Sequence, residues 1–291
     1  MTEEPDLPSL WSHAPHLNLR FQAGAKVADI DTSSTPGFQG KKADAATLQV
    51  ERNKRLASLQ ELLFANSKAE TGDDYSVLLV LQGMDTAGKG GIVKHVVGAV
   101  NPMGVRYTAF GPPTEEERAH DYLWRIRKAL PPAGHIGVFD RSHYEDVLIV
   151  RVHNMVPPQV WGARYDEINA FEQELTDSGM KLVKVAMFLS REEQKKQLLE
   201  RLDDPTKYWK YNTKDIDERG YWRDYQEAYQ AVLDRTSTEH APWYVVPCDR
   251  RWYSRLAITE LLIEALKSFN LAWPPADFDI KLEKKRLAAS S

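Results

Sequence analysis

The sequence predicts an α/β fold in which a parallel sheet has helices on both faces. Short apolar segments alternate along the chain with longer amphipathic segments, as in proteins built from repeated strand–helix–strand units. The segment 77–81 is apolar throughout, which is typical of a strand covered on both faces. The 291 residues show no internal repeat and no second domain, so we expect a single folded unit.

Five strands are expected, and turn-forming or polar residues follow them. A glycine-rich turn comes after the first strand, Gly111-Pro112-Pro113 ends the second, and Asp140 follows the third. In sheets of this kind, ligands bind beyond the carboxyl ends of the strands, so the turns after the first and third strands should meet at one edge. The expected strands are 77–81, 105–110, 136–139, 181–189 and 243–246.

Helices are expected between the strands, and capping residues mark where two of them begin. Thr114 with Glu117, and Ser190 with Glu193, form capping-box patterns. Residues 43–65 place leucines on one face, which predicts an amphipathic helix. The other expected helices are 92–100, 114–130, 159–176, 191–202, 221–236 and 255–269.

Three segments lack a regular pattern. Residues up to about 42 are rich in Pro, Ser, Thr and Gly, and we expect an extended arm that lies on the domain or on a neighbour. The segment 203–220 is polar and is expected to be irregular. The tail after Ile280 is charged and is expected to fray.

Composition limits the classes of function. The formal net charge is −4, so a site for a polyanion must be a local basic patch. The single cysteine, Cys248, excludes an intrachain disulfide. The N-terminus lacks a signal-peptide pattern, and no apolar run is long enough to span a membrane, so we expect a cytoplasmic protein.

A glycine-rich turn, Gly83 to Lys89, lies between the first strand and a helical segment. Glycines allow backbone N–H groups to face an anion, the helix N-terminus adds a positive end, and Lys89 adds a charge. Gly90 and Gly91 replace the usual Ser or Thr that meets Mg²⁺, and Asp85 is a substitute oxygen ligand. A plain turn with a solvated lysine is the alternative, but the position of the turn favours phosphate binding.

Asp140 and Arg141 follow the third strand and are expected at the same edge. A carboxylate there suits Mg²⁺, held directly or through water, and an arginine suits a bidentate phosphate contact. The alternatives are an aspartate that caps the next helix and a surface ion pair.

A mixed segment from Arg201 to Lys210 follows the fourth strand and its helix. By itself it reads as a solvated face. Beside a phosphate loop it is better interpreted as a lid that closes over phosphates and excludes water. Arg106, Arg118 and Arg125 are further candidates to reach an acceptor, and the spacing of the last two puts them on one face of the expected helix.

Four motifs in order resemble the type 2 polyphosphate kinases. They are Gly-Met-Asp-Thr-Ala-Gly-Lys-Gly-Gly at 83–91, Asn-Pro-Met-Gly-Val-Arg at 101–106, Phe-Asp-Arg-Ser-His-Tyr-Glu-Asp-Val at 139–147 and Arg-Leu-Asp-Asp-Pro-Thr-Lys-Tyr-Trp-Lys at 201–210. The motif Ser-His-Tyr-Glu-Asp-Val-Leu resembles the corresponding motif of the subgroup that accepts both AMP and ADP.

The resemblance implies a P-loop, thymidylate-kinase-like three-layer sandwich with a central five-stranded parallel sheet and a helical lid. Together with the composition of the two ends, it divides the chain into an arm (1–42), one kinase domain (43–275, with the lid at about 201–222) and a tail (276–291). It implies reversible phosphoryl transfer between inorganic polyphosphate and AMP or ADP, and guanine nucleotides are further candidates. Mg²⁺ is the expected metal, with Mn²⁺ as a substitute. A homodimer or homotetramer is expected.

The resemblance also implies roles for individual residues. Asp85 and Asp140 organise the metal, and with Lys89 and Arg141 they form the catalytic set. The expected polyphosphate-binding residues are Lys89, Arg141, Arg201, Lys207 and Lys210. The expected nucleotide-binding residues are Gly83, Ala87, Gly88, Lys94, Arg106 and Glu145.

Other functions compete with this interpretation. The nearest is an ATP-dependent nucleoside monophosphate kinase of the same fold. The residue pattern without the family motifs hardly distinguishes this enzyme from a polyphosphate-dependent kinase. A P-loop ATPase or switch protein, whose lid binds a partner, is another. A polyanion-binding module without chemistry is disfavoured, because the net charge is negative and no RNA-binding motif is present.

Overall fold

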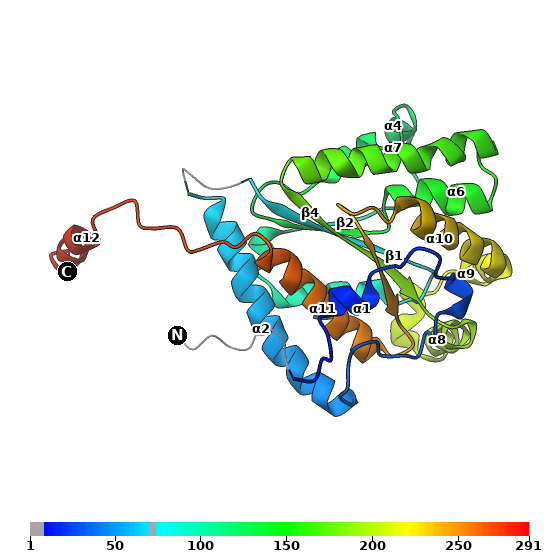
Figure 1. The fold of residues 1–291 in the computed structure, drawn as a ribbon, viewed down its shortest axis with the longest axis horizontal. Helices are drawn as coiled ribbons and strands as arrows, with labels where there is room; N and C mark the ends of the chain where they lie inside the picture. Colours follow the sequence, from blue (N-terminus) through cyan, green and yellow to red (C-terminus); the bar gives the residue numbers. More distant parts are fainter. Residues whose placement is uncertain (1–8, 70–73, 291) are drawn as a thin grey trace.

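A five-stranded parallel sheet forms the centre of the computed structural model, which describes residues 9–69 and 74–290. The spatial order of the strands is β2-β3-β1-β4-β5, and every pairing between them is parallel. This confirms the predicted fold class (Figure 1). The strands are β1 (Ser76–Gly83), β2 (Val105–Ala109), β3 (Ile136–Asp140), β4 (Met180–Phe188) and β5 (Trp243–Pro247).

The register of the strands brings their carboxyl ends to one edge. Leu81 of β1 lies beside Asp140 of β3, and Gly83 lies beside Met187 of β4. The turn that leaves β1 and the turn that leaves β3 are therefore neighbours, as expected from the topology.

Helices cover both faces of the sheet, and alternate residues of β1 face opposite cores. Val77, Leu79 and Leu81 belong to one apolar cluster, which includes residues of α2 (Lys42–Asn66) and α11 (Arg251–Lys267). Leu78 and Val80 belong to the other, which includes residues of α7 (Pro158–Asp177) and α10 (Trp222–Thr236). Figure 1 shows these two helical layers on either side of the sheet.

The remaining helical elements are short. The α-helices are α1 (Pro15–Leu19), α3 (Lys89–His95), α4 (Glu115–Arg118), α5 (Trp124–Ala129), α6 (Ile149–Val152), α8 (Arg191–Asp203), α9 (Lys214–Glu218) and α12 (Ile280–Ala288). The 3₁₀ turns are η1 (Val27–Asp29), η2 (Val97–Ala99), η3 (Pro102–Gly104), η4 (His143–Val147), η5 (Pro205–Lys210) and η6 (Arg219–Tyr221). No helix in the described ranges is both long and apolar enough to cross a membrane.

The described part of the N-terminal arm lies on its own domain. Trp11 and Leu19 are buried in the core that contains α11. Arg20 forms an antiparallel bridge with Tyr244, and the Phe21 N–H donates to the Trp243 carbonyl at 2.8 Å. The arm thus covers the outer edge of β5. The first eight residues of the expected arm lie outside the described residues.

The prediction of a single helix at 114–130 is wrong, because the segment forms two short helices. The Thr114–Glu117 capping box is present and opens α4. The carboxylate of Asp121 then accepts a hydrogen bond from the Leu123 N–H at 3.0 Å, so a local turn competes with the helix. Arg118 and Arg125 consequently do not share one helix face.

Two segments expected to be irregular contain helical turns. Within 203–220 the chain forms η5 and α9. The tail forms α12, where the carboxylate of Asp279 accepts hydrogen bonds from the N–H groups of Lys281 and Leu282. An N-cap of this kind stabilises a helix start that charge and composition alone did not predict.

Candidate active site

The loop after β1 has the backbone geometry of an anion site. Thr86 and Gly88 both have positive φ, at 67° and 105°, and Gly88 is the N-cap of α3. Turns of this kind direct successive backbone N–H groups into one concavity. Gly83 is required for a different reason, because a Cβ there would lie 2.8 Å from the Met187 carbonyl oxygen.

Lys89 is buried and folded back on this loop. Its Nζ donates to the Gly83 carbonyl at 2.6 Å, and its exposed fraction is 8%. The alternative of a solvated lysine is therefore wrong. The Thr86 hydroxyl is also buried and has no hydrogen-bond partner among the described residues. Thr86 and Lys89 line the same cavity, and an unpaired buried hydroxyl in such a lining indicates a place for a bound ligand.

Arg141 connects the two turns at the sheet edge. Its Nη2 lies 3.0 Å from Asp85 Oδ1, and its backbone N–H donates to the Leu81 carbonyl at 3.0 Å. Burial opposes its charge, but Glu145, Asp85 and Asp140 together raise the pKa of Arg141 above its usual value. The guanidinium is thus held charged between carboxylates.

Asp140 lies at the end of β3 with a weak partner. The Tyr107 hydroxyl is 3.4 Å from Asp140 Oδ2, which is a long hydrogen bond. Burial, and then the charge of Asp140, raise the pKa of Tyr107. The Asp140 side chain therefore keeps acceptor capacity for another group.

Glu145 belongs to η4, directly after this turn. Burial raises the pKa of its carboxyl, whereas Arg141 and Lys89 lower it. In the amide orientation that satisfies both neighbours, Gln82 donates to Glu145 Oε1 at 3.1 Å and accepts from the Ser142 N–H at 3.1 Å. Ser142 also caps η4. The strand and the turn together fix the position of this carboxylate.

Two cavities meet at the pair formed by Asp85 and Arg141. The larger, of about 880 Å³, is lined by the phosphate loop, Asp140 and the cationic residues of α8 and η5. The smaller, of about 190 Å³, is lined by residues that include Glu145, Leu148 and Tyr225. Asp85 and Arg141 line both cavities.

The segment expected to be a lid is tied to the site by polar contacts. Gln194 of α8 donates to the Asp85 carbonyl at 3.1 Å, and its Oε1 accepts from Arg219 at 2.6 Å. Arg201 donates to the Lys210 carbonyl at 2.8 Å and pairs with Asp215 at 3.2 Å. These contacts join α8, η5, α9 and η6 into one cover over the sheet edge.

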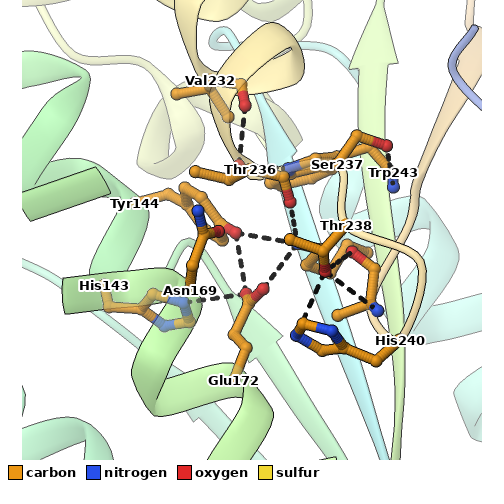
Figure 2. Close-up of polar contacts among 12 residues, drawn as sticks. His143, Tyr144, Asn169, Glu172, Val232, Thr236, Ser237, Thr238, His240 and Trp243 are labelled. Atoms are coloured by element: carbon orange, nitrogen blue, oxygen red, sulfur yellow. Dashed lines mark hydrogen bonds and ion pairs between the residues drawn. The ribbon is translucent and has the colours of Figure 1, made fainter. Parts of the chain in front are cut away.

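A buried polar cluster behind η4 was not predicted. Lys184 of β4 lies 2.6 Å from Glu172, 2.7 Å from the Thr236 carbonyl and 3.0 Å from the Tyr144 hydroxyl. Figure 2 shows His143 and Tyr144 directed toward the Glu172 carboxylate. Burial opposes its charge, but Lys184 and His143 hold the pKa of Glu172 below its usual value. The cluster connects η4 with β4, α7 and α10.

Most of the predicted site residues lie at the same edge of the sheet, but they are divided between the two cavities. Gly83 and Glu145 line the smaller cavity. Ala87, Gly88 and Lys94, which were also expected to bind nucleotide, line the larger one. The predicted polyphosphate-binding residues all line the larger cavity: Lys89, Arg141, Arg201, Lys207 and Lys210.

Arg106 is not brought into either cavity. Its guanidinium donates to the carbonyls of Lys128 and Leu130, at 2.6 and 2.9 Å, and lines a separate groove beyond β2. Arg125 lies in the same groove, where it donates to the Gly111 carbonyl. The geometry gives Arg106 a structural role and does not support its expected contact with nucleotide.

Comparisons with known proteins agree with the motifs. The model of the family described as polyphosphate kinase 2 matches residues 46–272. An AMP/ADP-polyphosphate phosphotransferase from Meiothermus ruber is 45% identical over 84% of this chain and 90% of its own length. An ADP-polyphosphate phosphotransferase from Rhodopseudomonas palustris is 41% identical over 84% and 86%. The crystal structure of polyphosphate kinase 2 from Arthrobacter aurescens is 51% identical, with a TM-score of 0.93 over 96% of this chain and 98% of that chain.

Proposed function

The chain belongs to the polyphosphate kinase 2 family, and we propose that it transfers phosphoryl groups between inorganic polyphosphate and both AMP and ADP. The observation that carries this assignment is the meeting of two different cavities at Asp85 and Arg141. A transfer between two substrates requires a place for each and one point where their phosphates meet.

The larger cavity suits the polyphosphate chain. Eight cationic side chains and three carboxylates line it, although the whole chain carries a net charge of −4. Polyphosphate has neither base nor sugar, so a row of cations is sufficient for its recognition. The cations are Lys89, Lys94, Arg141, Arg201, Lys207, Lys210, Arg251 and Arg255.

The smaller cavity suits the nucleotide. Leu148, Ile149 and Tyr225 supply apolar surface for a base, and Asn212 and Lys214 supply polar groups. A mixed lining of this kind is typical of pockets for small organic ligands. The nucleotide phosphates would extend toward Arg141 and Glu145, where the other cavity begins.

Mg²⁺, with Mn²⁺ as a substitute, is the metal that fits. The described residues hold no cluster of three His, Cys, Asp or Glu side chains suited to a metal. Mg²⁺ in phosphoryl-transfer enzymes is commonly bound by one or two carboxylates together with phosphates and water, and Asp85 and Asp140 provide such a partial set. When bound, the metal neutralises charge on the reacting phosphates.

The residues of the chain perform the transfer chiefly by alignment and charge neutralisation. Lys89 and Arg141 hold the terminal phosphoryl group of the donor, and an oxygen of the nucleotide phosphate attacks the phosphorus in line. The bond to the rest of the polyphosphate breaks as the new one forms, and the shortened chain leaves as the anion. The acceptor phosphate is ionised at neutral pH, so no general base is needed.

The lid and the domain limits remain part of the proposal. Residues 201–222 are the lid that excludes water from the meeting point, within a kinase domain at 43–275. AMP and ADP are cytoplasmic metabolites, which is the basis for proposing a cytoplasmic location. A homodimer or homotetramer is proposed because α12 has no buried residue and Trp273 and Phe278 are more than half exposed.

The test incubates AMP, and in a second reaction ADP, with polyphosphate and Mg²⁺ in the absence of ATP, followed by chromatography of the nucleotides. From AMP, ADP should appear first and ATP later. If ADP is converted to ATP but AMP does not react, the acceptor is restricted to the diphosphate. If AMP reacts only after ATP is added, the donor is ATP and the enzyme is a nucleoside monophosphate kinase. Light scattering of the purified protein measures the oligomer.

A further inference from the structure

A buried ion pair lies behind η4 and takes no part in the proposed chemistry. Lys184 of β4 and Glu172 of α7 are 2.6 Å apart, and neither side chain is exposed. Burial lowers the pKa of Lys184, whereas the charge of Glu172 raises it. Replacing a buried pair by apolar side chains of similar volume often leaves stability unchanged or improves it, because both charges must be desolvated. Stability alone therefore does not account for the pair.

The pair is joined to η4, which carries Glu145. The Tyr144 hydroxyl donates to Glu172 Oε1 at 2.7 Å and accepts from Lys184 Nζ at 3.0 Å. His143 Nε2 lies 3.3 Å from the same carboxylate oxygen, and among the described residues its Nδ1 has no hydrogen-bond partner. Two successive residues of this short turn are therefore anchored to Glu172 (Figure 2), and the next, Glu145, lines the smaller cavity.

The same ammonium group is joined to α10. Lys184 Nζ donates at 2.7 Å to the carbonyl of Thr236, the last residue of the helix, where carbonyl groups lack a partner within the helix. The Thr236 hydroxyl also accepts from Trp243 Nε1 at 2.9 Å, which ties this end of α10 to β5. Tyr225 and Tyr229 of the same helix line the smaller cavity.

The turn η4 and the helix α10 thus supply neighbouring parts of one lining. Burial is the largest cause of the raised pKa of Tyr229, and the charge of Glu145 is the next, which places the two groups near one another. Lys184 has one hydrogen bond to each of these elements, so its ammonium group fixes the distance between them. Hydrogen bonds restrict distance and direction more closely than apolar contacts do.

We propose that Lys184 and Glu172, through Tyr144, are positioning residues for the nucleotide. They hold η4 and α10 at a fixed spacing, so that Glu145 and Tyr229 are in place before the nucleotide binds. The inference rests on the proposed function, because it takes the smaller cavity as the nucleotide site. Among the residues that the structure describes, the lining of the larger cavity includes none from η4 or α10, so the cluster acts on the nucleotide and not on polyphosphate.

The first test is Tyr144→Phe, which removes the hydroxyl between the ion pair and η4 and keeps the ring that packs on Trp243. The dissociation constant for AMP, measured by equilibrium titration without polyphosphate, should rise about tenfold, the scale of one lost contact. The KM values for AMP and ADP should rise by a similar factor. The KM for long-chain polyphosphate should change by less than about twofold, because other elements line its cavity.

A double variant separates positioning from stability. Lys184→Met/Glu172→Leu leaves no unpaired buried charge, so its stability should exceed that of Lys184→Met. Its affinity for AMP should nevertheless stay about tenfold below that of the wild type, because the links from β4 and α7 to η4 and α10 remain absent. A cluster with only a structural role would instead regain AMP affinity together with stability.

The matched control is Leu175→Ala, which removes apolar contacts from the same core and none of these hydrogen bonds. It should lower Tm and leave the binding of both substrates unchanged. Equal loss of AMP and polyphosphate affinity in Tyr144→Phe, unchanged AMP affinity in that variant, or a loss of AMP affinity in the control would each overturn the inference. A wild-type protein that binds AMP but uses no polyphosphate would refute the proposed function, and the AMP affinities of the variants would still decide this inference.

Discussion

Lys89 and Asp140 illustrate how single residues prepare the site before any substrate binds. The lysine is held by the Gly83 carbonyl, 2.6 Å away, and among the described residues the side chain of the aspartate has only a long hydrogen bond with Tyr107. Neither group requires a large rearrangement to meet a phosphate or a metal ion. Such preorganisation is the main source of rate in phosphoryl transfer.

Replacing either residue should therefore affect turnover far more than folding. Lys89→Ala and Asp140→Ala should each lower turnover by about 10²-fold or more, the scale of one lost preorganised contact. Initial rates at saturating polyphosphate and ADP measure this, and melting curves serve as the control. Near-normal rates in both variants would refute the site.

Glu145 has a raised pKa, and this predicts a gain in stability when its charge is removed. Burial raises the folded-state pKa above 4.5, so the ionised form disfavours folding at neutral pH, and this penalty disappears as pH falls through the folded pKa. Glu145→Gln should raise Tm at pH 7 by about 2 °C or more, with a smaller difference near pH 4.5.

The same variant should lower the rate with AMP by about tenfold, since the carboxylate lies where the acceptor phosphates are proposed to bind. Thermal melts at several pH values and rates with AMP and ADP test both statements. A lower Tm at pH 7 would contradict the electrostatic explanation.

A site residue could be predicted from the sequence when it belongs to a short motif that directly follows a strand. Asp85, Lys89, Asp140 and Arg141 follow strand ends within short motifs, so the sequence places them directly. Arg255 could not be found in this way, because its position beside Gly91 depends on how α11 packs against α3. Arg106 has the right charge, but backbone carbonyls hold its side chain in another groove.

At the scale of elements, strands were easier to predict than helix limits. Apolar runs located β1, β3, β4 and β5 to within a few residues, because these strands are largely buried, whereas the edge strand β2 has no buried residue. The helix expected at 114–130 divides because Asp121 forms a local turn, an interaction that periodicity does not reveal. The cap at Asp279 likewise creates α12 in a tail without periodicity.

The strand β4 contains a lysine whose burial periodicity alone did not predict. Lys184 and Lys181 lie three residues apart and so on opposite faces of the strand; Lys184 is fully buried and Lys181 is exposed. Lys184 is tolerated because Glu172, Tyr144 and the Thr236 carbonyl satisfy its ammonium group. Three partners on three other elements have no signature in the sequence around residue 184.

Lys184→Met should destabilise the fold by about 3–5 kcal/mol, because the buried Glu172 carboxylate loses its ammonium partner and keeps only the contacts with His143 and Tyr144 that the structure describes. Lys181→Met, on the exposed side of the same strand, should change stability by less than about 0.5 kcal/mol. Adding Glu172→Leu to Lys184→Met should recover part of the loss. Denaturant unfolding measures all three, and equal effects of the two lysine variants would contradict this account.

At the scale of the whole molecule, the charge is distributed unevenly. The chain is acidic overall, whereas the larger cavity is cationic. In a chain with a negative net charge, a basic cleft guides a polyanion to itself and makes the binding of that polyanion strongly dependent on salt.

A higher salt concentration should therefore weaken the binding of polyphosphate more than the binding of nucleotide. For a fourfold increase in salt, KM for long-chain polyphosphate should rise about tenfold, by analogy with counterion release from other polyanions. KM for AMP should rise by a smaller factor, because the smaller cavity also supplies apolar contacts. Initial rates at several salt concentrations test this, and equal sensitivity would argue against separate sites.

The meeting of two separately lined cavities at Asp85 and Arg141 also determines the order of events in catalysis. In the proposed assignment each substrate has its own cavity, so neither must depart before the other binds. Double-reciprocal plots should intersect, as they do for a ternary complex, and should not be parallel. A spent nucleotide can exchange while the polymer stays bound, so one chain can be consumed unit by unit in a single encounter.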